Sequence, residues 1–184
     1  ALTSYIDPGD KVLIPDPCYP AYTAIVKMLG GIPVPLPLNS ANDFSIDQDL
    51  LNESMKSKPK CMLFSHPSNP LGTAFNLQEM SAIVEACRKY DVILIVDEIY
   101  RELYLNTPIP GFYGMYDKLL VISGVSKSHR MTGWRIGWVI GAPELVKPII
   151  ITHQYISTCA GNLGQRLAVH ALSDQGMRSI SRLN

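Results

Sequence analysis

The sequence predicts an α/β fold: an open, mostly parallel sheet with helices on both faces and one antiparallel strand. Strand-like and helix-like segments alternate along the chain, as is typical of parallel sheets connected by helices. Residues 92–96 are continuously apolar, which indicates a strand covered on both faces. Only residues 125–134 separate the last two predicted strands, whereas a parallel crossover needs about a dozen or more residues. These strands should therefore pair antiparallel, with Lys127 at the bend.

The strands are predicted as short apolar stretches bounded by turn residues. Pro8-Gly9-Asp10 is a turn that precedes the first strand. The second strand contains several prolines, and it should lie at an edge of the sheet because proline cannot donate a hydrogen bond to a neighbouring strand. In chain order, the predicted strands are residues 11–15, 32–38, 60–65, 92–97, 118–124 and 135–141.

The helices are predicted from apolar residues at helical spacing. In residues 77–90, Met80, Ile83, Val84 and Cys87 fall on one helical face. Residues 98–105 are expected to form a helical turn, followed by a loop over residues 106–114. In chain order, the predicted helices are residues 19–29, 47–56, 77–90, 143–155 and 161–174.

Composition argues against several classes of function. The chain has 184 residues, of which 47% are hydrophobic, enough for a sizeable core. Lysine plus arginine equals aspartate plus glutamate at 16 each, so the chain is a poor candidate for binding nucleic acid through phosphate neutralisation. No apolar run reaches the roughly 18 residues that a membrane span requires. We therefore expect neither a nucleic-acid nor a membrane partner.

The cysteines and the chain ends predict a cytoplasmic protein that is longer than this chain. Cys18, Cys61, Cys87 and Cys159 are far apart and form no CxxC pair, so reduced thiols are expected rather than a zinc site or disulfides. We expect no signal peptide, because the sequence lacks a charged start followed by an apolar stretch. The chain begins at an alanine and ends within a helix-like stretch, so we expect a piece of a larger polypeptide.

Chemically distinctive residues follow the predicted strands at one rim of the sheet, where open α/β sheets bind ligands. They include an amide, a carboxylate, a phenol, a lysine, an arginine and an aromatic ring, carried by residues 65–72, 97–100, 126–135 and 16–20. This set suits pyridoxal phosphate. Its aldehyde needs an amine, its ring nitrogen a carboxylate, its phenolic oxygen hydrogen-bond donors, its phosphate a cation and its ring a stacking surface.

Four motifs in this region carry a family resemblance. They are Asp-Pro-Cys-Tyr-Pro-Ala-Tyr (16–22), Pro-Ser-Asn-Pro-Leu-Gly (67–72), Asp-Glu-Ile-Tyr (97–100) and Ser-Lys-Ser-His-Arg-Met-Thr-Gly-Trp-Arg-Ile-Gly (126–137). In sequence, order and separation they resemble those of class I/II aminotransferases of fold type I, which use pyridoxal 5'-phosphate. The likeness covers essentially the whole chain. It implies that residues 1–184 form the large catalytic domain without its N-terminal segment and without the C-terminal small domain.

The resemblance assigns the central chemistry to Lys127 and Asp97. Lys127 resembles the lysine that forms a Schiff base with the cofactor, and we expect burial and the nearby Arg135 to favour its neutral form. The alternative is an ordinary exposed loop lysine. Asp97 resembles the aspartate that pairs with the ring nitrogen, and the alternative is a helix N-cap.

The resemblance also assigns hydrogen-bonding and stacking roles. Asn69 and Tyr100 resemble the pair that binds the phenolic oxygen, and the alternatives are turn chemistry for the asparagine and a half-buried tyrosine with its hydroxyl in water. Tyr19 resembles the aromatic residue that stacks on the ring, and the alternative is a core tyrosine at a helix start.

The phosphate is assigned to Arg135, whose guanidinium can bind it bidentately, and to Ser126. The family often has a serine three residues before the lysine, where this chain has Gly124, so either Ser123 or Ser126 could supply the hydroxyl and we favour Ser126. His66 is expected to be a solvated turn residue. For His129 nothing indicates a place near the substrate.

The family resemblance implies transfer of an amino group between an amino acid and a 2-oxo acid by a protein that is a homodimer when full length. Three alternatives stay open from the sequence. They are a β-lyase or cyclopropane-forming synthase on the same fold, a non-catalytic regulatory domain, and a scaffold that binds no cofactor. No spacing of histidines or cysteines indicates a metal site.

Overall fold

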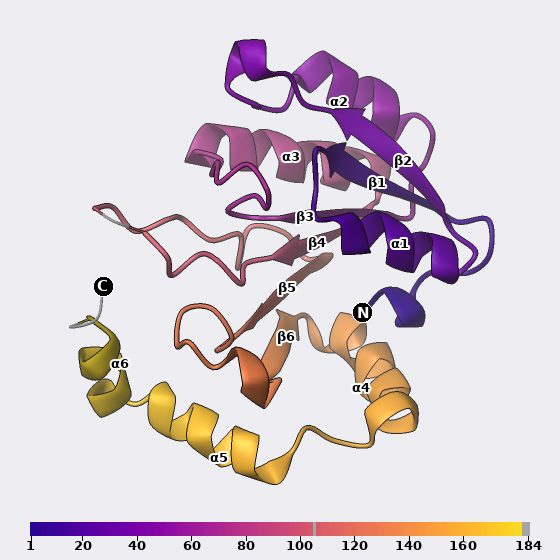
Figure 1. The fold of residues 1–184 in the computed structure, drawn as a ribbon. Coiled ribbons are helices and arrows are strands. Elements are labelled where there is room, and N and C mark those ends of the chain that lie inside the picture. Colours follow the sequence, from indigo (N-terminus) through magenta and orange to yellow (C-terminus); the bar gives the residue numbers. More distant parts are fainter. Residues whose placement is uncertain (105, 182–184) are drawn as a thin grey trace.

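The computed structural model of the protein describes residues 1–104 and 106–181. At its centre lies one sheet of six strands in the order β2-β1-β3-β4-β5-β6 (Figure 1). Strands β1 to β5 run parallel to one another, and β6 runs antiparallel to β5. The predicted fold class, the antiparallel last pair and the edge position of the proline-rich strand are therefore confirmed. The strands are β1 (Lys11–Asp16), β2 (Ile32–Pro37), β3 (Cys61–Ser65), β4 (Ile93–Asp97), β5 (Leu119–Gly124) and β6 (Gly137–Gly141).

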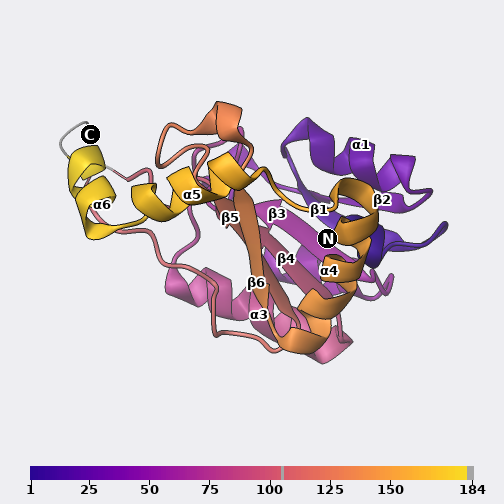
Figure 2. The same ribbon diagram turned by 90° about the horizontal axis from the view of Figure 1, so that it is seen from below.

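Helices lie on both faces of the sheet. They are α1 (Pro20–Met28), α2 (Gln48–Met55), α3 (Leu77–Tyr90), α4 (Pro143–Ser157), α5 (Asn162–Ala171) and α6 (Asp174–Ser181), with short 3₁₀ turns η1 (Leu2–Ser4), η2 (Ser40–Asn42) and η3 (Thr132–Trp134). The N-terminal turn η1 lies beside α4, and α5 lies beyond the β6 edge (Figures 1 and 2). Within residues 1–104 and 106–181, no helix combines the length and apolarity needed to cross a membrane.

Two hydrophobic cores fill the space between the sheet and these helices. Side chains of α2 and α3 form one core, and side chains of α1 and α4 pack into the other. Along β4, Leu94 and Val96 belong to the first core and Ile95 to the second, because successive residues of a strand point to opposite faces. This explains the continuous apolar run that predicted a doubly covered strand.

Helix α3 begins and ends where the sequence predicts, and its caps show why. Asn76 accepts hydrogen bonds from the backbone N–H groups of Gln78 and Glu79, and the Glu79 side chain accepts one from the N–H of Asn76. At the other end Asp91 adopts a left-handed conformation with φ of 59°, which terminates the helix. Strand β4, which leads to the site, begins shortly after this cap.

Two local predictions are wrong. The helix predicted over residues 161–174 is interrupted after α5, because Ser173 acts as the cap of α6 and its hydroxyl accepts a hydrogen bond from the N–H of Gly176. The helical turn predicted over residues 98–105 forms no helix in its described part. It is an irregular turn closed by hydrogen bonds from the N–H of Arg101 to the carbonyl of Glu98 and from Leu103 to Tyr100. Leu105 lies outside the described residues.

Candidate active site

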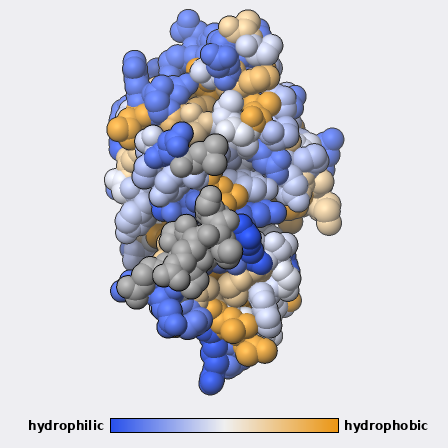
Figure 3. Space-filling model, turned by 60° about the vertical axis from the view of Figure 1, so that its left-hand side comes forward, coloured by the Kyte–Doolittle hydropathy of each residue, from blue (hydrophilic) through white to orange (hydrophobic). Residues whose placement is uncertain are grey.

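A cavity of about 560 Å³ opens at the carboxyl ends of β4 and β5. Tyr19 and Asn69, which follow β1 and β3, also line the cavity. The sheet order changes direction between these two strands, the kind of position where open α/β sheets bind ligands. Figure 3 shows the molecule with the left-hand side of Figure 1 turned forward, where hydrophilic and hydrophobic residues are mixed on the surface. Every site residue predicted from the sequence lines the cavity: Tyr19, Asn69, Asp97, Tyr100, Ser126, Lys127 and Arg135. The volume lies within the range of roughly 300–1,000 Å³ that is typical of small-molecule sites.

Asp97 is the last residue of β4, and two donors hold its carboxylate. The hydroxyl of Tyr22 donates to Oδ2 at 3.0 Å, and the backbone N–H of Ile99 donates to Oδ1 at 3.1 Å. Burial raises the pKa of Asp97, and the two hydrogen bonds oppose that increase. The helix-cap alternative is not supported, because the described residues that follow form a turn instead of a helix. An acceptor group of raised pKa therefore faces the cavity and would be stabilised by a cationic N–H donor.

Tyr22 is a site residue that the sequence analysis did not single out. It lies on α1 three residues after Tyr19, and this helical spacing brings the two rings together with centroids 5.5 Å apart. Only 8% of Tyr22 is exposed. Burial and the charge of Asp97 raise the pKa of Tyr22, so its hydroxyl keeps the proton that it donates. The i, i+3 spacing after the predicted stacking residue is the signal that could have found it.

Replacement of Tyr22 by phenylalanine tests this contact. Loss of the hydroxyl should raise the pKa of Asp97 further and lower the free energy of unfolding at pH 7 by about 1.5–3 kcal/mol, the usual value for a hydrogen bond to a charged group. Denaturant unfolding and an NMR titration of Asp97 measure both effects. Tyr155→Phe is the matched control, because Tyr155 is 87% exposed and should change stability by less than about 0.5 kcal/mol. Equal effects of the two substitutions would contradict the assignment.

Asn69 and Tyr100 form a hydrogen-bonded pair in the cavity. The Asn69 side-chain amide donates to the Tyr100 hydroxyl at 3.2 Å, which leaves the phenolic hydrogen able to donate to a ligand. The hydroxyl of Ser65 accepts from the backbone N–H of Asn69 at 2.9 Å and so fixes the loop that carries the amide. Turn chemistry is thus part of how Asn69 is held, and both side chains line the cavity.

Lys127 lies in the connection between β5 and β6. This connection is closed by a hydrogen bond from the Thr132 hydroxyl to the carbonyl of Ser126 at 2.8 Å. The Lys127 ammonium nitrogen lies 5.6 Å from the centre of the Tyr100 ring. The expected burial of Lys127 is wrong for this chain, because the side chain is exposed at the cavity mouth. Lys127 and Asp97 nevertheless line the same cavity, as the sequence analysis required.

Arg135 adopts a left-handed backbone conformation at the end of η3, with φ of 55°. Such a conformation is uncommon for a residue other than glycine and is often found at functional sites. The guanidinium donates to the carbonyl of Thr132 at 3.0 Å and is otherwise exposed at the cavity. Its remaining donors can bind an anion.

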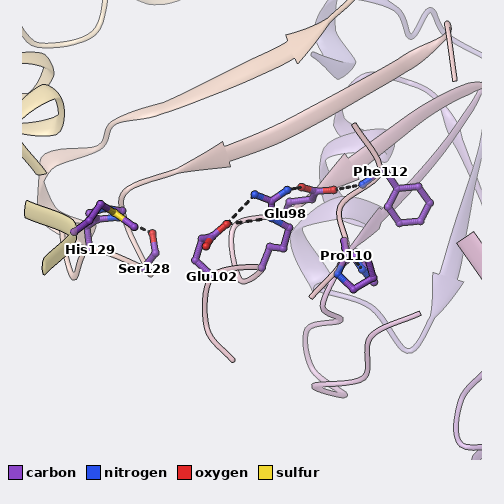
Figure 4. Close-up of polar contacts among 9 residues, drawn as sticks. Glu98, Glu102, Pro110, Phe112, Ser128 and His129 are labelled. Atoms are coloured by element: carbon purple, nitrogen blue, oxygen red, sulfur yellow. Dashed lines mark hydrogen bonds and ion pairs between the residues drawn. The ribbon is translucent and has the colours of Figure 1, made fainter. Parts of the chain in front are cut away.

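The two histidines differ from each other in their surroundings. The prediction that His66 is solvated is wrong, since this side chain is fully buried and its Nε2 lies 3.0 Å from the carbonyl oxygen of Pro110. His129 hydrogen-bonds to Ser128 at 2.7 Å and does not line the cavity (Figure 4). Within residues 1–104 and 106–181, no group of three or more histidine, cysteine, aspartate or glutamate side chains could hold a metal ion.

Comparison with known proteins decides the family. The model of the family "Aminotransferase class I and II" matches residues 1–182. The chain belongs to the class I and II aminotransferase family. The sequence motifs at the cavity had predicted this assignment.

Relatives in the aminotransferase family are similar to the whole chain but are longer. A putative aminotransferase, YugH, of Bacillus subtilis is 36% identical over 100% of this chain and 48% of its own length. Human kynurenine–oxoglutarate transaminase 3 is 34% identical over 91% of this chain and 40% of its own length. The chain thus spans about half the length of such relatives, or somewhat less.

Solved aminotransferase structures share the fold. An aspartate aminotransferase from Thermus thermophilus with maleate superposes with a TM-score of 0.94, at 24% identity over 99% of this chain and 48% of that one. An N-succinyldiaminopimelate aminotransferase from Mycobacterium tuberculosis superposes with a TM-score of 0.89, at 29% identity over 99% of this chain and 48% of that one. The fold of this chain is therefore a known aminotransferase architecture.

The structure explains why this family member has a glycine at position 124. A Cβ atom at Gly124 would lie 2.7 Å from the carbonyl oxygen of Ile136, so the close approach of β5 and β6 leaves no room for a side chain. Ser123 and Ser126 both line the cavity, on either side of that glycine. Both serines thus place a hydroxyl group close to Gly124 in the cavity lining.

Proposed function

We propose that this chain is the cofactor-binding part of an aminotransferase that uses pyridoxal 5'-phosphate to move an amino group between an amino acid and a 2-oxo acid. The observation that carries the proposal is the single cavity lined by Lys127, Asp97 and the Asn69–Tyr100 pair. The family membership supports the reaction class. The relatives' names include different amino acids, so the proposal names the substrate class only.

The donor set of the cavity fits this cofactor. Asp97 offers a carboxylate of raised pKa, which suits a protonated ring nitrogen. Asn69 and Tyr100 offer two donors to one oxygen, and Lys127 offers a primary amine. Arg135 and Ser126 offer a guanidinium and a hydroxyl for a phosphate.

When bound, pyridoxal phosphate supplies an aldehyde that condenses with primary amines and a ring that accepts electrons. Asp97 would hold a proton at the ring nitrogen, and Tyr22 orients the Asp97 carboxylate through the 3.0 Å hydrogen bond. The Tyr100 hydroxyl, oriented by Asn69, would donate at the phenolic oxygen. Tyr19, which is 45% exposed, would supply the aromatic surface for the ring.

Lys127 provides the reactive amine. Its Nζ would condense with an aldehyde with release of water and, when free, would take a proton from the α-carbon of a substrate and deliver it to the carbon two bonds away. Its exposure at the mouth of the cavity leaves it accessible to the incoming amino acid. Arg135 and Ser126 would hold the phosphate of the cofactor.

Covalent trapping tests the proposal. The full-length protein incubated with pyridoxal 5'-phosphate should gain an absorbance band. Borohydride should then abolish that band and leave a pyridoxyl group on Lys127, detected by mass spectrometry of peptides. A protein that acquires neither the band nor the adduct would contradict the proposed function and favour a scaffold without cofactor.

The phosphate assignment has a separate test. Arg135→Ala should weaken binding of pyridoxal 5'-phosphate by about 10–100-fold, the equivalent of one charge-assisted interaction of 1.5–3 kcal/mol. Binding of pyridoxal, which lacks the phosphate, should change little. Arg166→Ala on the exposed side of α5 is the control and should leave both affinities unchanged. Equal losses for pyridoxal and its phosphate would show that Arg135 acts elsewhere.

We further propose that residues 1–184 are the incomplete large domain of a full-length homodimer located in the cytoplasm. The support for the domain is the match to about half of longer aminotransferases. The support for the location is that Cys18, Cys61, Cys87 and Cys159 are all free thiols. The homodimer is implied by the family resemblance, and light scattering of the full-length protein tests it.

A further inference from the structure

Residues 110–112, which we call the brace segment, form hydrogen bonds with two loops that carry site residues. One loop follows β3 and carries Asn69, and the other follows β4 and carries Tyr100. The carbonyl of Pro110 bonds to the first loop through His66, and the N–H of Phe112 bonds to the second through Glu98. Both partners of the hydrogen-bonded pair in the cavity are therefore anchored to the same short segment.

Glu98 forms the anchor of the second loop. Only 3% of this residue is exposed, and its Oε1 accepts the Phe112 N–H at 2.7 Å while Oε2 accepts from Arg101 at 3.1 Å (Figure 4). Position 111 is a glycine, and a Cβ there would lie 2.3 Å from the Arg101 guanidinium, which would have to shift. Tyr100 lies within the turn that Glu98 and Arg101 close.

His66 forms the anchor of the first loop, and its tautomer is determined by its partners. Nε2 lies 3.0 Å from the carbonyl of Pro110, which can only accept, and Nδ1 lies 3.4 Å from the backbone N–H of Phe75, which can only donate. The ring must therefore be neutral with its proton on Nε2. The aromatic rings of Phe75, stacked at 5.6 Å, and Phe112, edge-on at 5.2 Å, enclose it.

We propose that His66 and Glu98 are positioning residues that act through the brace segment to fix the Asn69–Tyr100 pair, and that neutral His66 is required for this. Neither residue lines the cavity, so neither is assigned contact with a ligand. The link to cofactor binding rests on the proposed function. The anchoring itself does not, because it concerns contacts between described residues of the chain.

Protonation of His66 would place a second N–H against the N–H of Phe75 and break that contact. Burial lowers the pKa of His66, and Arg101 lowers it further, whereas the Pro110 carbonyl and Glu79 oppose the decrease. A lowered pKa means that the anchored state loses stability as pH falls below the ordinary histidine value of 6.5. Burial raises the pKa of Glu98, so the contribution of Glu98 to stability changes with pH in the opposite direction. A variant without the histidine is therefore needed to separate the effect of His66 from that of Glu98.

Hydrogen exchange of the cofactor-free full-length protein measures the anchoring. Between pH 7.5 and 5.5, the protection factor of the Phe75 amide should fall with pH by up to about tenfold per pH unit below 6.5. His66→Gln can still donate to the Pro110 carbonyl and does not titrate, so its protection should vary much less with pH. His66→Asn is too short to reach Pro110 and should lower protection of the Phe112 amide at every pH. A flat wild-type profile, or a His66→Gln profile as steep as the wild type, would overturn the role of neutral His66.

A double-mutant cycle tests whether the anchoring reaches the site. His66→Asn should weaken binding of pyridoxal 5'-phosphate about 3–10-fold in the wild-type background and much less in an Asn69→Ala background, because its effect passes through Asn69 and Tyr100. Equal losses in both backgrounds would overturn the positioning role. If the protein binds no pyridoxal phosphate at all, the proposed function fails while the exchange experiment still decides on the anchoring.

Discussion

Replacing Lys127 with alanine in the full-length protein should reduce turnover by at least about 10³-fold and leave the fold intact. The substitution removes the primary amine at the cavity, and with it both the covalent attachment point and the group that moves the proton. The side chain is exposed and supports no core packing, so stability should change by less than about 0.5 kcal/mol. Steady-state kinetics with an amino acid and a 2-oxo acid, together with thermal unfolding, measure the two effects.

Two controls make the Lys127 experiment specific. Lys27→Ala, on the exposed surface of α1, removes an equivalent charge outside the cavity and should retain full turnover. The Lys127→Ala protein should also still bind pyridoxal phosphate without covalent attachment, because Asp97 and Arg135 remain. Retained turnover in Lys127→Ala would contradict the role proposed for this residue.

Replacing Asp97 with asparagine should weaken binding of pyridoxal phosphate by about 10–100-fold and lower turnover. The amide keeps the shape of the carboxylate but loses the charge that holds a proton at the ring nitrogen, and a hydrogen bond between charged groups contributes about 1.5–3 kcal/mol. Fluorescence titration with the cofactor measures the affinity. An unchanged affinity would contradict the assignment of Asp97.

Whereas Asp97→Asn should weaken cofactor binding, it should not lower the free energy of unfolding. The pKa of Asp97 is raised in the folded state, so its contribution to stability is present at low pH and is lost as pH rises above the ordinary aspartate value. The cofactor-free variant should therefore be at least as stable as the wild type at pH 7, and the advantage should shrink toward pH 3.8. Urea unfolding at both pH values distinguishes this result from general damage to the fold, which would lower stability at pH 7.

Much of the fold could be predicted because it depends on local patterns. The continuous apolar run that ends at Asp97 indicated a strand covered on both faces, and the short connection around Lys127 excluded a parallel crossover. Residues at the carboxyl ends of neighbouring parallel strands necessarily meet at one edge. For that reason the candidate site residues could be grouped before their positions were known.

What could not be predicted depends on contacts between distant parts of the chain. His66 resembles a polar loop residue, yet it is buried because residues 110–112 pack over it. Tyr22 reaches Asp97 across 75 positions of sequence. The exposure of Lys127 likewise depends on which segments cover the cavity mouth, and the immediate neighbours of a lysine do not encode this. Sequence patterns therefore predicted which residues line the cavity better than which residues hold them in place.

The central claim is that Lys127 and Asp97 bind opposite ends of one ligand in the same cavity. A crystal structure of the full-length protein, soaked with pyridoxal 5'-phosphate and reduced with borohydride, tests this most directly. The account predicts continuous density from Nζ of Lys127 to the cofactor, with the ring nitrogen at a hydrogen-bond distance of roughly 2.7–3.2 Å from the Asp97 carboxylate. Attachment at another lysine, or a ring nitrogen that faces away from Asp97, would contradict it.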